Sequence, residues 1–117
     1  MTLPESLDVL VRLMPERYRK DALDGYEFCD PDGEWWLLPL DEPTRNGIAL
    51  STCFLIEQML SGALPVILLE RDGDKIVLLN ERSMSILEEV YWVEQEPRHG
   101  TLHEAVTIAA ATALEGR

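Results

Sequence analysis

Two histidines four residues apart, His99 and His103, are the side chains of this sequence best suited to bind a metal ion. On a continuous helix this spacing would place both imidazoles on one face, with Glu104 beside them, as in a helical zinc site. However, Gly100 and Thr101 fall between them, and the pairing of Thr101 with Glu104 has the spacing of a capping box. The helix is therefore expected to begin after Thr101, with His99 outside it. We interpret the histidines as unrelated and predict no bound metal, with a small metal-dependent hydrolase as one alternative.

A second set of possible ligands is the acidic run Asp30, Asp32 and Glu34. A calcium-binding loop needs oxygen ligands at its first, third and fifth positions, glycine at the sixth and a late glutamate. The Asp-Pro-Asp-Gly sequence at 30–33 is too compact for this and is typical of a hairpin turn. The sequence also has no nucleophile elbow, phosphate-binding glycine loop or Cys/His dyad spacing. We predict that the protein is not an enzyme and needs no cofactor.

The charge of the chain narrows the kind of partner it could bind. The 117 residues carry a net charge of −12 at pH 7, which disfavours direct binding to nucleic acid or to an anionic membrane. The same charge permits a protein partner with a basic surface. Residues 25–44 contain six acids and no basic residue. This acidic segment is where we expect such a partner to bind.

Two adjacent tryptophans, Trp35 and Trp36, lie inside the acidic segment. Neighbouring residues of a strand point to opposite faces, so one indole must leave the layer that the other occupies. Aromatic residues dominate binding hot spots, and an indole without cover would need a partner. The residues predicted to bind a partner protein are Asp30, Asp32, Glu34, Trp35, Trp36, Asp41 and Glu42.

The elements that would position these residues follow from hydrophobic periodicity and turn residues. A capping box at Thr2 starts a first helix, and residues 16–23 read as a second short helix ending at Gly25. A hairpin over 26–38, a helix over 47–61, a hairpin over 65–80, a strand over 90–94 and a helix from Thr101 complete the chain. We predict a single α+β domain over 1–117, with an antiparallel sheet of about five strands packed with helices. With the short helix over 16–23 left aside, the order is α-β-β-α-β-β-β-α.

Three further features bear on location and assembly. The acidic N-terminal residues do not resemble a secretory signal, and Cys29 and Cys53 form no C-x-x-C motif, so a cytoplasmic protein with two reduced, packed cysteines is expected. The hairpin over 65–80 is apolar on both faces. If it forms a sheet edge it favours pairing with another strand, and a homodimer is therefore expected as one form of the protein.

The layout resembles the phage ABA (α-β-α) sandwich domain family. The similarity is carried by the tryptophan segment at 34–39, by the apolar helix at 46–60 and by the alanine-rich helix at 101–111. The resemblance implies a helix-sheet-helix fold and an origin in a phage or prophage. It implies no catalytic residues.

These observations together favour a small acidic binding protein of phage or mobile-element origin. It would inhibit a host defence protein by occupying a basic surface, with electrostatic steering that makes binding sensitive to salt. An immunity protein that neutralises a basic toxin would also bind through attraction between opposite charges, and it is the nearest alternative function. A self-associating structural component is a further alternative.

Overall fold

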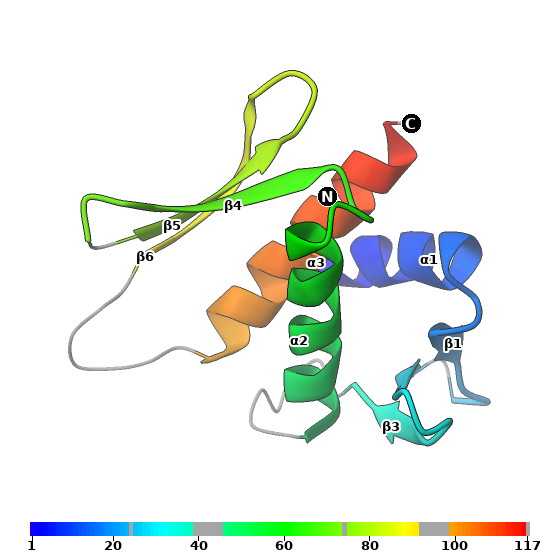
Figure 1. Cartoon of the computed structure of the whole chain (residues 1–117). Coiled ribbons are helices and arrows are strands. Elements are labelled where there is room, and N and C mark those ends of the chain that lie inside the picture. Colours follow the sequence, from blue (N-terminus) through cyan, green and yellow to red (C-terminus); the bar gives the residue numbers. More distant parts are fainter. Residues whose placement is uncertain (24, 39–45, 74, 92–98, 117) are drawn as a thin grey trace.

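The computed structural model describes residues 1–23, 25–38, 46–73, 75–91 and 99–116 (Figure 1). The described residues have an α+β architecture in the order α-β-β-β-α-β-β-β-α. The elements are α1 (Leu3–Leu13), β1 (Tyr18–Lys20), β2 (Tyr26–Cys29), β3 (Trp35–Leu37), α2 (Asn46–Leu60), β4 (Val66–Arg71), β5 (Lys75–Asn80), β6 (Ile86–Tyr91) and α3 (His99–Glu115). The α+β class and the antiparallel pairing are as predicted from the sequence.

The strands form two separate three-stranded sheets, β1-β2-β3 and β4-β5-β6. The prediction of one sheet of about five strands is therefore wrong. The reason is α2, which follows β3 and ends shortly before β4 (Figure 1). A helix of 15 residues is about 22 Å long. The two sheets contact opposite ends of α2, so β3 and β4 lie too far apart to pair.

The short helix predicted over 16–23 is instead strand β1 and a turn. Tyr18 lies opposite Phe28 in the sheet, and the two ring centroids are 5.2 Å apart. Burial of Tyr18, which is 1% exposed, outweighs the weak helical preference of its neighbours. Gly25 ends no helix. Its N–H donates to the Asp21 carboxylate, which closes the turn between β1 and β2.

Strand β6 and helix α3 begin at other residues than those predicted. Strand β6 begins at Ile86 rather than Val90, after a turn in which Met84 has a φ of 58°. Helix α3 begins at His99, so Thr101 lies inside it and is not its N-cap. Gly100 falls in the first turn, where the N–H groups have no partner within the helix and glycine costs little. By contrast, the predicted capping box at Thr2 is present at the start of α1.

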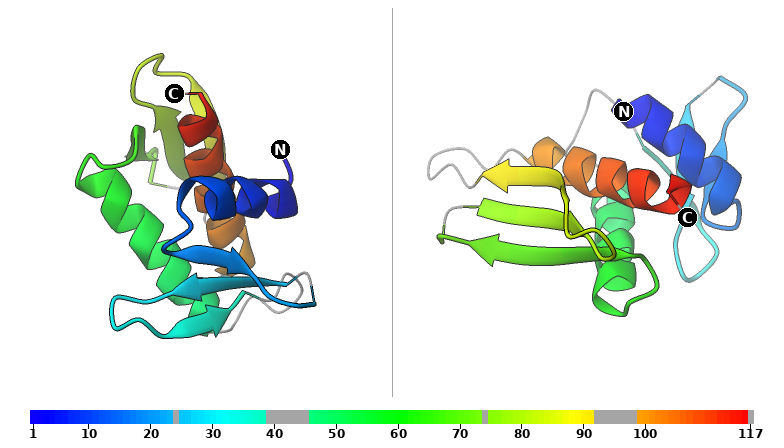
Figure 2. Two further views of the ribbon diagram at one scale, coloured as in Figure 1. Left: turned by 90° about the vertical axis from the view of Figure 1, so that its right-hand side faces the viewer. Right: turned by 90° about the horizontal axis from the view of Figure 1, so that it is seen from above.

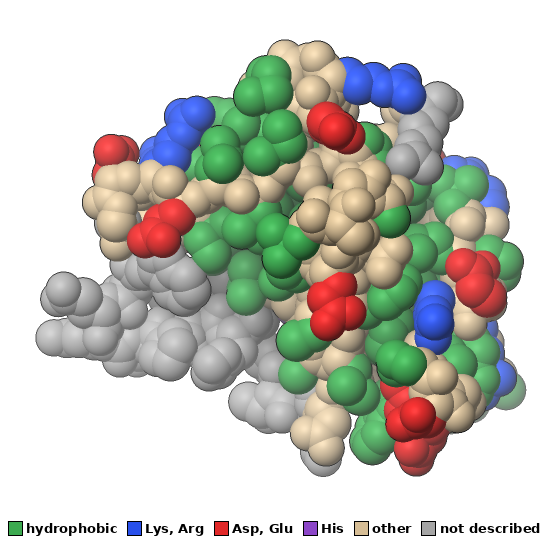
Figure 3. Space-filling model, in the orientation of Figure 1, with side chains coloured by type: hydrophobic (Ala, Val, Ile, Leu, Met, Phe, Trp, Pro, Cys, Tyr) green, Lys and Arg blue, Asp and Glu red, His purple; other side chains and the backbone are tan. Residues whose placement is uncertain are grey.

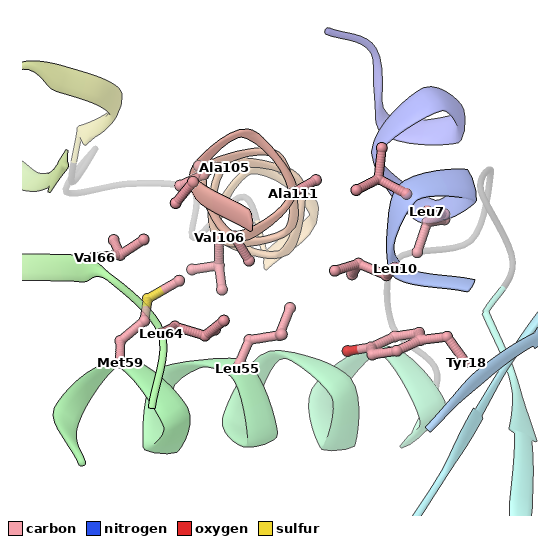
Figure 4. Packing of buried hydrophobic residues seen from close by; sticks show 14 of the residues in the cluster. Leu7, Leu10, Tyr18, Leu55, Met59, Leu64, Val66, Ala105, Val106 and Ala111 are labelled. Carbon is pink, nitrogen blue, oxygen red and sulfur yellow. The ribbon is translucent and has the colours of Figure 1, made fainter. Parts of the chain in front are cut away.

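Helix α3 lies at the centre of the hydrophobic core. It contacts α1, α2 and all three strands of the β4-β5-β6 sheet. Figure 4 looks along this helix. Val106 points toward Leu55 of α2, and Leu10 of α1 lies to the right of α3. Ala109, Ala110 and Ala111 are fully buried, and these small side chains let neighbouring helices approach closely.

Helix α2 is apolar on nearly all sides, yet it is not buried on all of them. Leu55 is 0% exposed, whereas Leu60 is 72% exposed and Cys53 is also exposed. The prediction that both cysteines are packed holds for Cys29 and is wrong for Cys53. No helix that the structure describes is long and apolar enough to cross a lipid bilayer.

Candidate functional site

The Asp30 side chain fixes the shape of the β2–β3 hairpin. Its Oδ1 accepts hydrogen bonds from the backbone N–H groups of Asp32 and Glu34, both at 2.9 Å. Its Oδ2 accepts from the indole Nε1 of Trp36 at 2.8 Å. These hydrogen bonds, the Trp36 bond first among them, lower the pKa of Asp30 below its ordinary value. Asp30 is only 7% exposed, so the structure places this predicted partner-binding residue inside the turn.

The two tryptophans point to opposite faces of the β1-β2-β3 sheet, as alternation predicts. Trp36 lies opposite Phe28, on the face that packs against α2. Trp35 lies opposite Cys29 on the other face. Both indoles are half-buried.

Trp35 shares its face of the sheet with a charged pair and an exposed leucine. The Arg19 guanidinium lies 3.9 Å from the centroid of the Trp35 ring and donates to Glu27 at 3.2 Å. Leu37, opposite Glu27 on β3, is 62% exposed. We call Arg19, Glu27, Trp35 and Leu37 the Trp35 face. The charges of Arg19 and Glu27 cancel, so this face has no net charge, and Leu37 and the Arg19 side chain are exposed on it.

The sheet that carries the Trp35 face is anchored firmly to α2. Gly47, in the first turn of α2, lies so close to β3 that a Cβ atom there would overlap the carbonyl oxygen of Leu37. On the same side the Tyr18 hydroxyl is 2.8 Å from the Ser51 hydroxyl, and the ring of Phe28 is 5.4 Å from that of Phe54. The position of the Trp35 face is thus set by core packing, which is the condition for a preorganised binding surface.

Acidic side chains adjoin the Trp35 face at the tip of the hairpin. Asp32 and Glu34 are exposed there. Asp41 and Glu42, also predicted to bind a partner, lie outside the described residues. The predicted site is therefore brought together in part: Trp35, Asp32 and Glu34 are at the surface, whereas Asp30 and Trp36 support them from within.

Sequence reasoning missed Arg19, Glu27 and Leu37 as members of this surface. The signal was the alternation of Arg17, Tyr18 and Arg19 along a strand, which the prediction of a helix over 16–23 hid. A strand there would have placed Arg19 beside the hairpin.

The histidine cluster does not assemble a metal site from the described residues. His99 lies in the first turn of α3, contrary to prediction, but its side chain is outside the described residues. His103 is 4% exposed, and burial lowers its pKa to about 4. No group of three potential ligands from histidine, cysteine, aspartate and glutamate occurs among the residues that the structure describes.

The hydrogen-bond partners of His103 show which of its ring nitrogens carries a hydrogen. Its Nδ1 is 3.1 Å from the Thr52 hydroxyl, and that hydroxyl donates to the Ile48 carbonyl at 2.8 Å. A hydroxyl has one hydrogen to donate, so Thr52 must accept from Nδ1–H. The histidine therefore joins α2 to α3 as a neutral donor, which is a structural role.

A small hollow adjoins the end of α2. It has a volume of about 220 Å³ and lies between the end of α2 and β4, with Glu81 as its charged residue among lining side chains such as Leu60 and Ile67. It brings no pair of catalytic groups together.

The chain was compared with protein-family models, with curated proteins and with solved structures, and none of the three comparisons finds a match.

Proposed function

We propose that this protein is a non-enzymatic binding protein that occupies a basic surface of another protein through its Trp35 face and the adjoining hairpin tip. The observation that carries the proposal is the exposed leucine beside a half-buried indole on a strand fixed by α2. Rigid aromatic and aliphatic side chains at the centre of a contact, ringed by polar groups, are the usual pattern of a binding hot spot.

The charge around this surface suggests the chemistry of the partner. Arg19 and Glu27 neutralise each other, whereas Asp32 and Glu34 are exposed on the hairpin tip. A partner with basic side chains around an apolar centre would complement both parts. Charges of this kind at a rim raise the association rate and make it depend on salt.

We further propose that the protein comes from a phage or mobile element and inhibits a host defence protein whose basic groove normally holds nucleic acid. This finer proposal is supported by the acidity of the chain and by the resemblance of its layout to the phage ABA sandwich domain. The neighbouring genes test it, since phage genes should flank this gene. A toxin gene directly upstream would instead favour an immunity protein.

The first prediction concerns Trp35. Replacing it with alanine should weaken binding to a partner about 30-fold, which corresponds to about 2 kcal/mol for loss of a hot-spot tryptophan. The measurement starts with immobilised wild-type protein, which captures partners from host lysate at low salt and releases them at high salt. A captured protein is then purified, and its affinity is measured by calorimetry against wild type and Trp35→Ala.

The matched control is Leu60→Ala, because Leu60 is 72% exposed and lies at the end of α2 opposite to the end that contacts β3. It should bind like wild type. If wild type and Trp35→Ala bind every captured protein equally well, the Trp35 face is not the binding surface. If release of the captured proteins does not depend on salt, the proposed basic surface of the partner is contradicted.

A further inference from the structure

The two sheets that the structure describes have four edge strands, and three of these are protected against pairing with another chain. Strands β1 and β3 have only three residues each. In addition, β1 carries Arg19 and Lys20, and the Leu37 carbonyl of β3 lies against α2. Strand β6 carries Glu88 and Glu89, and its pairing with β5 includes a register shift. Shortness, charges, irregular pairing and cover by a helix are the usual means of protecting a sheet edge.

Strand β4 lacks these protections over most of its length. It has six residues, its pairing with β5 is regular, and residues 66–69 are all apolar, with Glu70 and Arg71 at the end. In the right-hand view of Figure 2, β4 lies at the outside of its sheet, and no helix or strand that the structure describes runs along its free edge. In Figure 3 hydrophobic side chains gather around the position of β4. A long, regular, apolar edge of this kind favours pairing with a further strand.

The register shows which backbone groups of β4 point away from β5. The Glu81 N–H donates to the Pro65 carbonyl at 2.9 Å, so these two residues form a hydrogen-bonded pair of the antiparallel ladder. Hydrogen-bonded pairs alternate with non-hydrogen-bonded ones, and the register of β4 with β5 continues without a shift. Residues 67, 69 and 71 therefore bond to β5, whereas residues 66, 68 and 70 direct their N–H and C=O groups to the free edge.

We propose that β4 pairs antiparallel with β4 of a second copy, which joins the two three-stranded sheets into one six-stranded sheet in a two-fold symmetric homodimer. With the two-fold axis at Leu68, residues 66, 68 and 70 of one copy lie opposite residues 70, 68 and 66 of the other. Each of these pairs exchanges two hydrogen bonds, so all the outward backbone groups are satisfied. On one face of the joined sheet, Ile67 of each copy lies beside Leu69 of the other.

Charge and side-chain pattern make a second copy the partner that fits this edge. Two chains of net charge −12 repel each other, and they repel least along a segment such as 66–69, which carries no charge. The two Glu70 residues would be four positions apart along the paired strands, or about 13 Å, which exceeds the screening length of about 8 Å in physiological salt. Leu69 is 38% exposed in the single chain and would gain an apolar neighbour. The edge is thus complementary to itself.

The test begins with the oligomeric state of the full chain, measured by sedimentation equilibrium over a range of concentrations. Wild type should approach twice the monomer mass of 13.3 kDa. Glu70→Pro removes an outward N–H and leaves the bonds between β4 and β5 in place, since proline is tolerated at the free side of an edge strand. It should raise the dimer dissociation constant roughly thirtyfold, because two hydrogen bonds are lost across the two-fold axis. Glu70→Gln removes the same charge but keeps the N–H, so it should dimerise like wild type.

A second pair of variants tests the side chains. Leu69→Lys and Ile86→Lys change the net charge equally, and Ile86, which is 53% exposed, lies on β6. Leu69→Lys should raise the dissociation constant roughly tenfold, because it replaces an apolar contact by a charge at the paired edge. Ile86→Lys should change the constant little. Circular dichroism checks that every variant folds.

Amide hydrogen exchange followed by NMR shows whether β4 is the strand that pairs. The N–H groups of Leu68 and Glu70 should exchange more slowly as the protein concentration rises, because they become hydrogen-bonded only in the dimer. A wild type that stays monomeric at all concentrations overturns the proposal. So does a dimer in which these two N–H groups exchange as fast as in the monomer, since the copies would then meet elsewhere. The result is independent of whether the Trp35 face binds a partner.

Discussion

The Asp30 carboxylate accepts hydrogen bonds from two backbone N–H groups of its turn and from the indole of Trp36. Each of these hydrogen bonds is stronger to the ionised group than to the neutral one. The pKa of Asp30 is therefore lowered, and its ionised form stabilises the fold. The contribution is present above pH 3.8, the ordinary value for this group, and is lost as the pH falls through the lower folded-state pKa.

Asp30→Asn should lower the free energy of unfolding at pH 7, because an amide has one fewer acceptor oxygen and its NH₂ would face the Trp36 N–H. Urea unfolding followed by tryptophan fluorescence measures this loss. The difference between wild type and Asp30→Asn should shrink when the pH falls below 3.8. A constant difference down to strongly acidic pH would show that the charge of Asp30 is not what the turn uses.

His103 gives an acid sensitivity of the same sign as that of Asp30, in a higher pH range. Its pKa is lowered from 6.5 to about 4 by burial, so the unfolded chain takes up a proton before the folded one. The stability from neutral His103 is full above pH 6.5 and falls as the pH drops toward 4. The total loss is roughly 3 kcal/mol by linkage.

His103→Asn should flatten this pH dependence. The asparagine Nδ2 can replace Nδ1–H as donor to Thr52, but it does not titrate. The absolute stability should fall, because the smaller side chain leaves a cavity. The measurement is the slope of the unfolding free energy between pH 4 and 6.5, and an unchanged slope in the variant would assign the acid sensitivity to other groups.

At the scale of elements, the contact between α2 and β3 decides whether replacing Gly47 raises or lowers the free energy of unfolding. Gly→Ala in a helix usually stabilises by about 1 kcal/mol. At Gly47 the added methyl would overlap the Leu37 carbonyl oxygen and press on Trp36. We expect Gly47→Ala to destabilise by about 1–3 kcal/mol, the usual cost of overpacking. At Gly116 an added methyl would be 3.5 Å from the nearest oxygen, so Gly116→Ala serves as the control and should change the thermal midpoint little.

Elements with strong local signals could be predicted from the sequence. The capping box at Thr2 starts α1, the Asp-Pro-Asp-Gly turn joins β2 to β3, and the two apolar runs around Gly73 form β4 and β5. Strand β1 was missed because the alternation at 17–19 is only a weak local signal, and the strand's three residues owe their conformation mainly to Phe28 and α2. The start of α3 was missed because the Thr101–Glu104 pattern occurs within the helix as well as at its start.

At the scale of the whole molecule, the sequence predicts the class of fold but not the division into two sheets. Which strands pair across α2 depends on contacts between residues far apart in the chain. The same limit applies to the site. The opposite orientation of Trp35 and Trp36 follows from alternation, whereas the place of Arg19 over Trp35 depends on β1 pairing with β2.

The central position of α3 has a consequence for synthesis. Every element that it contacts, α1, α2 and the β4-β5-β6 sheet, leaves the ribosome before it does. Until residues 99–115 emerge, Leu7, Leu10 and Leu55 lack the helix against which they pack in Figure 4. The nascent chain then exposes hydrophobic surface and is open to chaperones and proteases. Stop codons just before this helix should thus yield degraded protein rather than a shorter folded one.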